Sequence, residues 1–378
     1  MYRIEYAKGS STYKVYTPFD DTYSILSAIY HRETNTVGQL TFSILYNHPF
    51  YNLFEEYSGI ISLYWKDTLL YKFRIIKIRR DLYNTRYIEC AGLLCFLTDS
   101  VVAPYTFNES NYIYPVTPSA SHTCTVPQFM RELIALHNVQ MPSAQQFEFV
   151  DDTDGYFDST TFTTSSTSYT STWQEIESKV LKNVGGYLQI RFGATVNQVV
   201  LKAALTENNV QTVQFAVNLK SLELETSSQK FATAIYPVST YTDASGHRQT
   251  VDIYNVNSGV PYVEDASAVS DYGRIVAYVP YEGIVSAERL KWFANHDLTA
   301  YINKKRSISI SVVDMAAVDG STPLEVDKRT HLVSVVNSVD TTAVLNAFDV
   351  DILNPTNSHF TFNGEVPAFT KRVHLFKN

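Results

Sequence analysis

Short runs in which apolar and polar residues alternate fill the first hundred positions of the chain. Every second residue from Leu40 to Ile44 is apolar, and further apolar runs follow at 60–65, 69–78 and 87–97. Alternation with a period of two is the pattern of a β-strand that buries one face. Because only short turns separate these runs, the region has little room for helices, and the pattern predicts an antiparallel sheet or a small barrel.

The alternation slips by one position inside the run 69–78. Tyr71, Phe73 and Ile75 share one phase, whereas Ile76 and Ile78 share the other. A slip of one residue within a strand is what a β-bulge produces. We therefore expect a bulge where Ile75 meets Ile76.

Helical spacing replaces the alternation in the middle of the chain. The segment 125–138 has a capping-box pair, Thr125 and Gln128, with Pro127 in the first turn, where its missing N–H is tolerated. It also carries mostly one apolar face. We expect an α-helix there, and a different region of the chain from about residue 103 onward.

A second helix is expected from Thr172, which forms another capping-box pair with Glu175, to the terminating glycines Gly185 and Gly186. Trp173 starts its apolar face, so we expect this side chain in the core. The preceding stretch, 159–172, has Ser or Thr at twelve of fourteen positions. Such a composition predicts an exposed loop or an extended edge segment.

The last part of the chain alternates again, interrupted by one helix. A hairpin is predicted from 187–192 and 199–205, and a third helix is predicted over 287–304 with Ser286 as its N-cap. Strands are expected beyond residue 210 at 213–224, 308–313, 332–336, 344–353 and 360–362. The fold class that follows is mainly β with α+β insertions.

Amino-acid composition excludes some classes of function but does not by itself assign one. The net charge is −8, which argues against binding nucleic acid or an anionic membrane as the main role. Charged residues make up 18% of the chain, below the usual ~25%, while aromatic residues reach 13%. Few charges and many tyrosines suit a surface that is partly hidden in an assembly.

The chain lacks the sequence marks of export and membrane insertion. It has three cysteines, Cys90, Cys95 and Cys124, too few for a disulfide scaffold, and we expect Cys90 and Cys95 to be buried thiols. No run of ~18 apolar residues suggests a membrane span, and the first residues alternate instead of forming a signal-peptide block. We expect synthesis and folding in a cytoplasm.

A search for chemistry finds no nucleophile elbow, phosphate-binding loop, dinucleotide fingerprint or zinc-protease motif. The acidic run 151–155 resembles a calcium loop, but with Gly155 sixth, Val150 would be first and Thr161 twelfth, so both ends fail. A solvated loop is the better interpretation. Asp349 and Asp351 share a strand face and could form an acid/base pair, although a polar sheet face explains them as well.

Two further clusters have ordinary explanations. His122 and Cys124 form the only close His/Cys pair, and zinc needs three or four ligands. A Cys/His peptidase would need its Cys at a helix start or elbow, with an orienting Asn or Asp. Cys124 does precede a predicted helix, so this alternative stays open. The run Lys304, Lys305 and Arg306 follows a predicted helix, whose dipole favours cations at its C-terminus. We predict no catalytic, cofactor-binding or metal site, no cofactor, and no enzymatic activity.

The sequence resembles the N-terminal hub region of phage tail-tip proteins. These proteins form the tail-associated lysin or prophage endopeptidase tail family, which is related to the baseplate hubs of contractile tails. Six segments in order carry the resemblance, and together they span nearly the whole chain. They are Arg32–Asn35 with Gly38–Phe42 and His48-Pro49, Leu136–Asn138, Trp173 with Gly185–Leu188 and Arg191, Phe231–Thr233 with Tyr236-Pro237, Asp271–Ile275, and Asn354-Pro355. One departure is 324–327, where members often have a Gly-Asp pair.

The resemblance implies a homotrimeric hub in the virion, at the tail tip or baseplate, that closes the distal tail tube. Two similar antiparallel β-barrel domains in each chain would let three copies mimic six and so adapt six-fold to three-fold symmetry. The expected domains are a first barrel at 1–105, a mixed α+β domain at 106–209, a second barrel at 210–245 with 306–378, and an inserted α+β domain at 246–305.

The implied partners are the distal tail protein ring, the tail tube and tape-measure proteins, and receptor-binding proteins, without specific nucleic-acid binding or a membrane span. Members of the family often carry a hydrolase or receptor-binding module after the hub. Two alternatives therefore stay open: a hub that carries or carried peptidoglycan endopeptidase activity, and an unrelated carbohydrate-binding β-protein.

Overall fold

The computed structural model describes residues 1–108, 110–113, 124–158, 162–193, 195–227, 231–242, 247–302, 305–336 and 339–363. Contacts between residues divide the chain into two compact units. The larger unit comprises Met1–Phe162, Ser166–Glu223 and Ile308–Asn378, and the smaller comprises Thr163–Ser165 and Leu224–Ser307. The fold is mainly β, as the sequence predicted.

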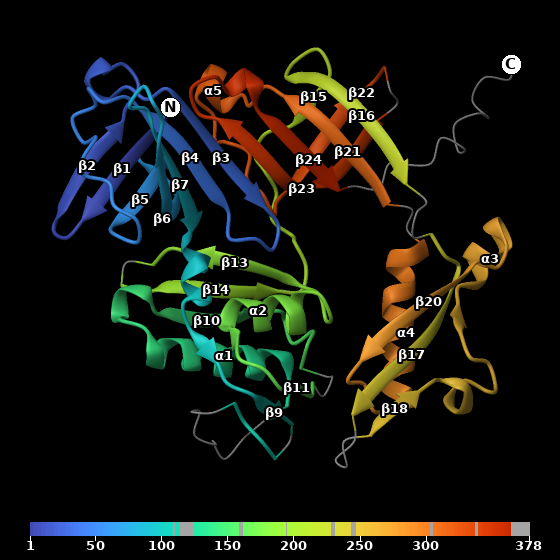
Figure 1. Cartoon of the computed structure of the whole chain (residues 1–378). Helices are drawn as coiled ribbons and strands as arrows, with labels where there is room; N and C mark the ends of the chain where they lie inside the picture. Colours follow the sequence, from blue (N-terminus) through green and yellow to red (C-terminus); the bar gives the residue numbers. More distant parts are fainter. Residues whose placement is uncertain are drawn as a thin grey trace, which may run out of the picture. The chain divides into compact units, whose positions relative to one another are not determined.

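A single mixed sheet of thirteen strands organises the larger unit (Figure 1). Its strand order is β16-β21-β24-β23-β3-β4-β7-β6-β5-β1-β2, with β22 also paired to β23 and β15 to β22. The strands are β1 (Tyr2–Lys8), β2 (Ser11–Tyr16), β3 (Ser27–Glu33), β4 (Gln39–Ile44), β5 (Ile60–Trp65), β6 (Thr68–Arg80), β7 (Arg86–Gly92), β15 (Val213–Gln214), β16 (Leu219–Ser227), β21 (Lys305–Val312), β22 (Arg329–Ser334), β23 (Val339–Asp351) and β24 (His359–Asn363).

The two strand-rich zones of the sequence meet at one pair of strands. β3 from the first zone pairs antiparallel with β23 from the second, from Ile29 opposite Asp351 to Glu33 opposite Ala347. Their buried side chains form one continuous hydrophobic cluster, in which Tyr30 and Phe348 meet edge to face at 5.0 Å. We call the β3–β23 pairing the seam. It makes the two zones one sheet over one core.

A mixed α/β region packs within the same unit. Its sheet joins β10 (Phe147–Asp152) in parallel to β14 (Asn197–Lys202), which pairs antiparallel with β13 (Tyr187–Arg191). The helices α1 (Val126–Gln140) and α2 (Thr172–Glu175), the latter continuing as a π-helical segment (Ile176–Leu181), contribute to a second core. Short elements complete the unit: a 3-10 helix (Leu93–Thr98), β8 (Val101–Val102), β9 (Tyr105–Phe107), β12 (Thr170–Ser171) and α5 (Ala316–Asp319).

The smaller unit is a four-stranded sheet with a helix on one face. β17 (Ala234–Thr242) pairs with β18 (Arg248–Val251), β19 (Val263–Glu264) and, in parallel, β20 (Val276–Glu282). The helix α4 (Ala287–Ile302) buries its apolar stripe against this sheet, and α3 (Ala266–Tyr272) precedes β20. β17 lies within residues 210–245, which were expected in the second barrel, whereas among the described residues it pairs only within this smaller sheet.

Local predictions agree closely with the structure. The register between β6 and β7 shifts between Ile75 and Lys77, which confirms the bulge. The Thr125 hydroxyl accepts a hydrogen bond from the N–H of Gln128, and the Ser286 hydroxyl accepts one from that of Arg289, which confirms both N-caps. The predicted hairpin around 187–205 is β13 with β14.

Four local predictions need correction. The second helix is capped by Ser171 and not by Thr172, because the Thr172 hydroxyl is bonded to Ser100 inside the core. Trp173 is only half-buried, while Ile176 is fully buried. The predicted strand 213–224 is broken into β15 and β16 by a turn in which Ala216 has a φ of 62°. Lys305 begins a strand, so it does not belong to the end of α4, and Lys304 lies outside the described residues.

Candidate functional site

Cys124, the candidate nucleophile of a Cys/His peptidase, is buried in the core. Its thiol donates to the carbonyl oxygen of Phe162 at 2.6 Å, and the N–H of Phe162 donates back to the Cys124 carbonyl at 2.7 Å. Cys124 is buried beside the N-cap of α1. Its proposed partner His122 lies outside the described residues. The thiol hydrogen bond therefore holds the backbone at Phe162 close to the N-terminus of α1.

The other two cysteines are buried free thiols, as predicted. Burial raises the pKa of Cys95 to about 11 and also raises the pKa of Cys90. Because the thiolate is the nucleophilic form, neither side chain has reactive character at neutral pH.

A serine–histidine pair does exist, at Ser100 and His137. The Ser100 hydroxyl lies 2.7 Å from His137 Nδ1 and 2.8 Å from the Thr172 hydroxyl, while His137 Nε2 lies 3.0 Å from the carbonyl oxygen of Gln145. A carbonyl only accepts, so Nε2 carries the proton and Nδ1 accepts from Ser100. Burial lowers the pKa of His137. Ser100, His137 and Thr172 are all fully buried, so no substrate reaches them, and the group ties α1 to α2.

The acidic run 151–155 is divided between separate partners. Asp151 accepts from the Thr153 hydroxyl at 2.6 Å, and Asp152 lies 3.6 Å from the Lys202 ammonium. Within the described ranges, no three His, Cys, Asp or Glu side chains come together in a way that could hold a metal ion. Of the helices described here, none combines the length and the apolar character that crossing a bilayer requires.

The polar face of the large sheet carries rows of paired side chains. In one row, Asp351, Ile29, Thr41, Glu89 and Lys77 lie directly opposite one another across five strands, from β23 to β6. Lys77 and Glu89 form an ion pair at 3.0 Å. Because this row crosses the seam, both strand zones contribute to one continuous polar surface.

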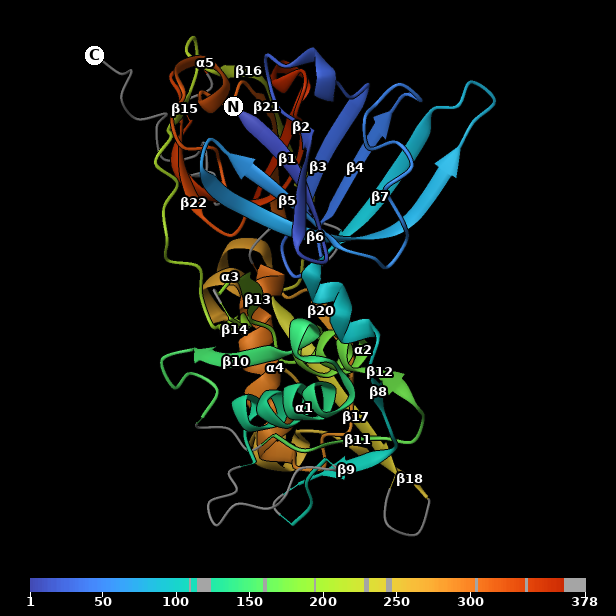
Figure 2. The same cartoon turned by 90° about the vertical axis from the view of Figure 1, so that its left-hand side faces the viewer.

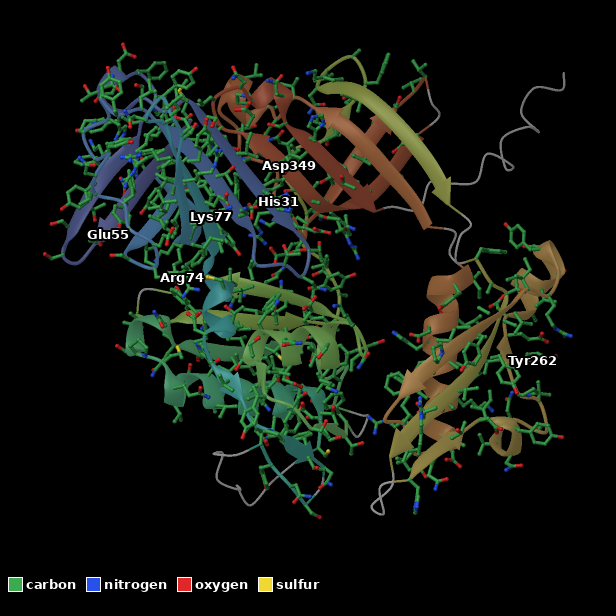
Figure 3. All side chains as sticks on the ribbon, in the orientation of Figure 1. His31, Glu55, Arg74, Lys77, Tyr262 and Asp349 are labelled. Carbon is green, nitrogen blue, oxygen red and sulfur yellow. The ribbon has the colours of Figure 1, made fainter. Side chains whose placement is uncertain are left out.

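The predicted carboxylate pair lies on this surface. Asp349 pairs with His31 across the seam at 2.8 Å, as Figure 3 shows, and Asp351 accepts from the backbone N–H groups of Leu353 and Asn354. His359 stands opposite Asp349 on the other side of β23. The two carboxylates therefore have separate structural partners, which fits the polar-face interpretation.

The first segment that carries the family resemblance, around 32–38, lies where three parts of the larger unit meet. Arg32 stacks over Tyr71 at 4.3 Å and lies 3.8 Å from Asp327, whose other oxygen accepts from the Thr34 hydroxyl at 2.7 Å. Burial raises the pKa of Asp327. These contacts connect the end of β3 with the loop before β22.

Asn35 extends the same junction to the mixed region. Its side chain donates to the Gly186 carbonyl at 3.0 Å and accepts from the Leu188 N–H at 2.8 Å. Gly186 has a φ of 94°, a conformation that favours glycine. Two motifs that were distant in the sequence, Asn35 and the Gly-Gly pair, are thus bonded partners. Sequence reasoning could identify each motif but not their contact.

His48, from the His-Pro motif, is a buried positioning residue. Its Nε2 lies 2.9 Å from the Val15 carbonyl oxygen and must donate to it, while Nδ1 accepts from the N–H of Phe50 at 3.2 Å. Both ring nitrogens are therefore used by the neutral form. Burial lowers the pKa of His48. The ring fixes the turn that follows β4.

Comparisons with known proteins agree with this architecture. Residues 207–373 match the model of the prophage endopeptidase tail family. No curated protein matches the chain in sequence.

Two solved structures with a similar fold are tail proteins. The tail protein from Neisseria meningitidis MC58 is 11% identical, with a TM-score of 0.64, over 96% of each chain. The 43 kDa tail protein of prophage MuSo2 from Shewanella oneidensis is 11% identical, with a TM-score of 0.62, over 97% of this chain and 98% of that one.

A third similar structure comes from a secretion system. It is the E. coli c3393 protein, described as a component of the type VI secretion system with structural similarity to the T4 bacteriophage tail proteins gp27 and gp5. It is 10% identical, with a TM-score of 0.50, over 92% of this chain and 74% of that one. In fold over almost its whole length, and in sequence over 207–373, the chain is thus similar to prophage tail proteins.

Proposed function

We propose that this protein is the structural hub of a phage or prophage tail tip, a homotrimer in the virion that closes the distal tube and adapts six-fold to three-fold symmetry. Its neighbours would be the distal tail protein ring, the tube and tape-measure proteins, and receptor-binding proteins. The similarity in fold to prophage tail proteins supports the location, and a matched pair of strand motifs supports the symmetry.

That matched pair carries the proposal. In the first zone, β5 of six residues leads into β6 of thirteen residues and then β7, all antiparallel neighbours. In the second zone, β22 of six residues leads into β23 of thirteen residues and then β24. Both long strands contain an irregular register, between Ile75 and Lys77 in β6 and between Leu345 and Ala347 in β23. Two copies of one motif in a chain would let a trimer present six similar units.

The four-domain division expected from the sequence stays a prediction: each strand zone would act as one barrel-like ring element, with β17 left out of the second. The seam sets the spacing of the two elements inside each subunit. Contacts between subunits then have to reproduce that spacing for the ring to close.

Native mass and image symmetry test the proposal together. A particle of three times the 42.8 kDa chain mass, seen in electron micrographs as a ring with six similar lobes, is the expected result. A monomer at micromolar concentration, or a ring whose three lobes lack matched counterparts, would refute the hub assignment.

A second candidate function, cell-wall hydrolysis, is favoured by the family description alone. Zymography on peptidoglycan from Gram-positive and Gram-negative walls tests it, with Cys124→Ala as the comparison variant. We expect no clearing from either protein. Clearing by the natural chain that Cys124→Ala abolishes would assign an endopeptidase role to the hub.

A further inference from the structure

Three turns converge at one end of the first strand zone. Ile44, the last residue of β4, lies opposite Arg86, the first residue of β7. Leu26, just before β3, donates its N–H to the carbonyl oxygen of Ser43 at 2.8 Å. The turn before β3, the turn after β4 and the 81–85 turn between β6 and β7 therefore lie at the same end of the sheet. Figure 2 shows the β6–β7 hairpin extending past its neighbours there.

These turns expose large apolar side chains. Leu26 is 51% exposed, Tyr46 68%, Leu82 89% and Tyr83 80%. Turns usually carry small or polar residues, because their side chains face water. We call these four residues the sheet-end patch. Exposed apolar residues gathered on one surface mark an interaction site more often than single scattered ones.

The turns that hold the patch are ordered before any partner arrives. Asp81 Oδ1 accepts from the N–H groups of Tyr83 at 2.9 Å and Thr85 at 2.8 Å. These bonds lower the pKa of Asp81 and keep it ionised. His48 fixes the 45–51 turn as described above, and Arg86 donates to the Tyr51 carbonyl. A pre-formed surface loses little conformational entropy on binding.

The patch is bordered by positive charge on an acidic chain. Arg79 and Arg80 are exposed at the tip of β6, and Arg79 stacks over Tyr87 at 4.1 Å. Among the residues that the structure describes, no carboxylate forms an ion pair with either guanidinium, since Asp81 faces its own turn. These arginines and the exposed Tyr and Leu side chains would complement a partner surface that has carboxylates around an apolar centre.

We propose that the sheet-end patch docks a different protein subunit of the tail, through an apolar surface bordered by Asp and Glu. The proposal deepens the hub function and rests on it. An isologous contact with a second copy of this chain is disfavoured, because it would set Arg79 and Arg80 of one copy against the same residues of the other. A heterologous contact with a second copy is one outcome that the experiment below distinguishes. The docking end is distinct from the seam, and Arg79 lies on the same sheet face as the Lys77–Glu89 pair.

Site-specific photo-cross-linking in assembled tails tests this inference. Tyr83→p-benzoylphenylalanine places the probe in the patch, and Tyr169→p-benzoylphenylalanine, at another exposed tyrosine outside it, is the matched control. The expected product joins residue 83 to a different polypeptide, at a segment rich in Asp or Glu with apolar neighbours. Arg79→Glu with Arg80→Glu should lower its yield on the order of tenfold. The control reversal Lys14→Glu, on β2, should leave the yield unchanged.

Other products would overturn the docking proposal. A cross-link from residue 83 to a second copy of this chain or to nucleic acid would contradict it. So would the absence of any product in intact tails, or a yield that the arginine reversals leave unchanged. Native mass of the purified variants separates this failure from failure of the hub function. A trimer without the cross-link rejects the patch alone, whereas a chain that neither trimerises nor enters tails rejects the hub.

Discussion

Replacing Phe348 by alanine tests whether the seam holds the two strand zones as one folding unit. Phe348 is 5% exposed and contacts Tyr30 edge to face at 5.0 Å and Phe360 at 6.0 Å. Tyr30 comes from the first zone and Phe360 from the second, so the substitution opens a cavity between strands from both zones.

The expected loss of stability is large. A buried Phe→Ala change costs ~3–5 kcal/mol through lost burial and a residual cavity. The edge-to-face pair with Tyr30 accounts for about 0.5–1.5 kcal/mol of this. In a protein of this size the melting temperature should fall by about 4–6 °C.

The next residue along β23 gives a matched control. Asp349 faces the opposite side of the sheet, with a 56% exposed side chain paired to His31. Exposed pairs contribute ~0–1 kcal/mol, so Asp349→Ala should hardly change stability. Differential scanning calorimetry of the full chain measures both. A Phe348→Ala loss no greater than that of Asp349→Ala would refute the seam as part of the core.

Further substitutions test other parts of the larger unit. Ile176→Ala should cost ~2–5 kcal/mol, and Trp173→Ala less, because only Ile176 is fully buried; equal losses in urea titrations would contradict this packing. Asn35→Ala should cost ~1–3 kcal/mol by leaving the Gly186 carbonyl and the Leu188 N–H unpaired, whereas a neutral effect would show that the junction is dispensable. Because the folded-state pKa of His48 lies below its unfolded value near 6.5, its contribution is complete above about pH 6.5 and declines as the pH falls. His48→Gln keeps a donor for Val15, so its melting temperature should decline less than that of the natural chain between pH 7.5 and 5, and parallel declines would contradict the assigned ring contacts.

Features that depend on neighbouring residues could be predicted from the sequence. The bulge at Ile76 shows as a phase slip because the period of a strand is two, and the caps at Thr125 and Ser286 show because an N-cap bonds within three residues. The predicted N-cap at Thr172 was wrong because the neighbouring residue suits the position equally well. Two adjacent hydroxyl residues both suit the position, and tertiary contacts with Ser100 decided between them.

Features that depend on distant partners could not be predicted. Nothing local to β3 indicates that its neighbour is β23, because many strands have a compatible pattern. The residues around Asn35 carried the family resemblance, yet their role as a junction needed Gly186, Leu188 and Asp327 in place. The same holds for the sheet-end patch, whose residues come from three separate turns. Only the register of β4 against β7 places them together.

The distance in sequence across the seam has a consequence for synthesis. His31 and Asp349 are 318 positions apart, so at ~5–20 residues per second the ribosome needs roughly 15–60 s to synthesise the partner of a strand that has already emerged. During that interval β3 has backbone groups open on one edge. The strand ends in His31, Arg32 and Glu33, and charged side chains at such an edge hinder pairing with another nascent chain. Arg32, which later contributes to the junction, is thus one of the charged side chains that would hinder such pairing.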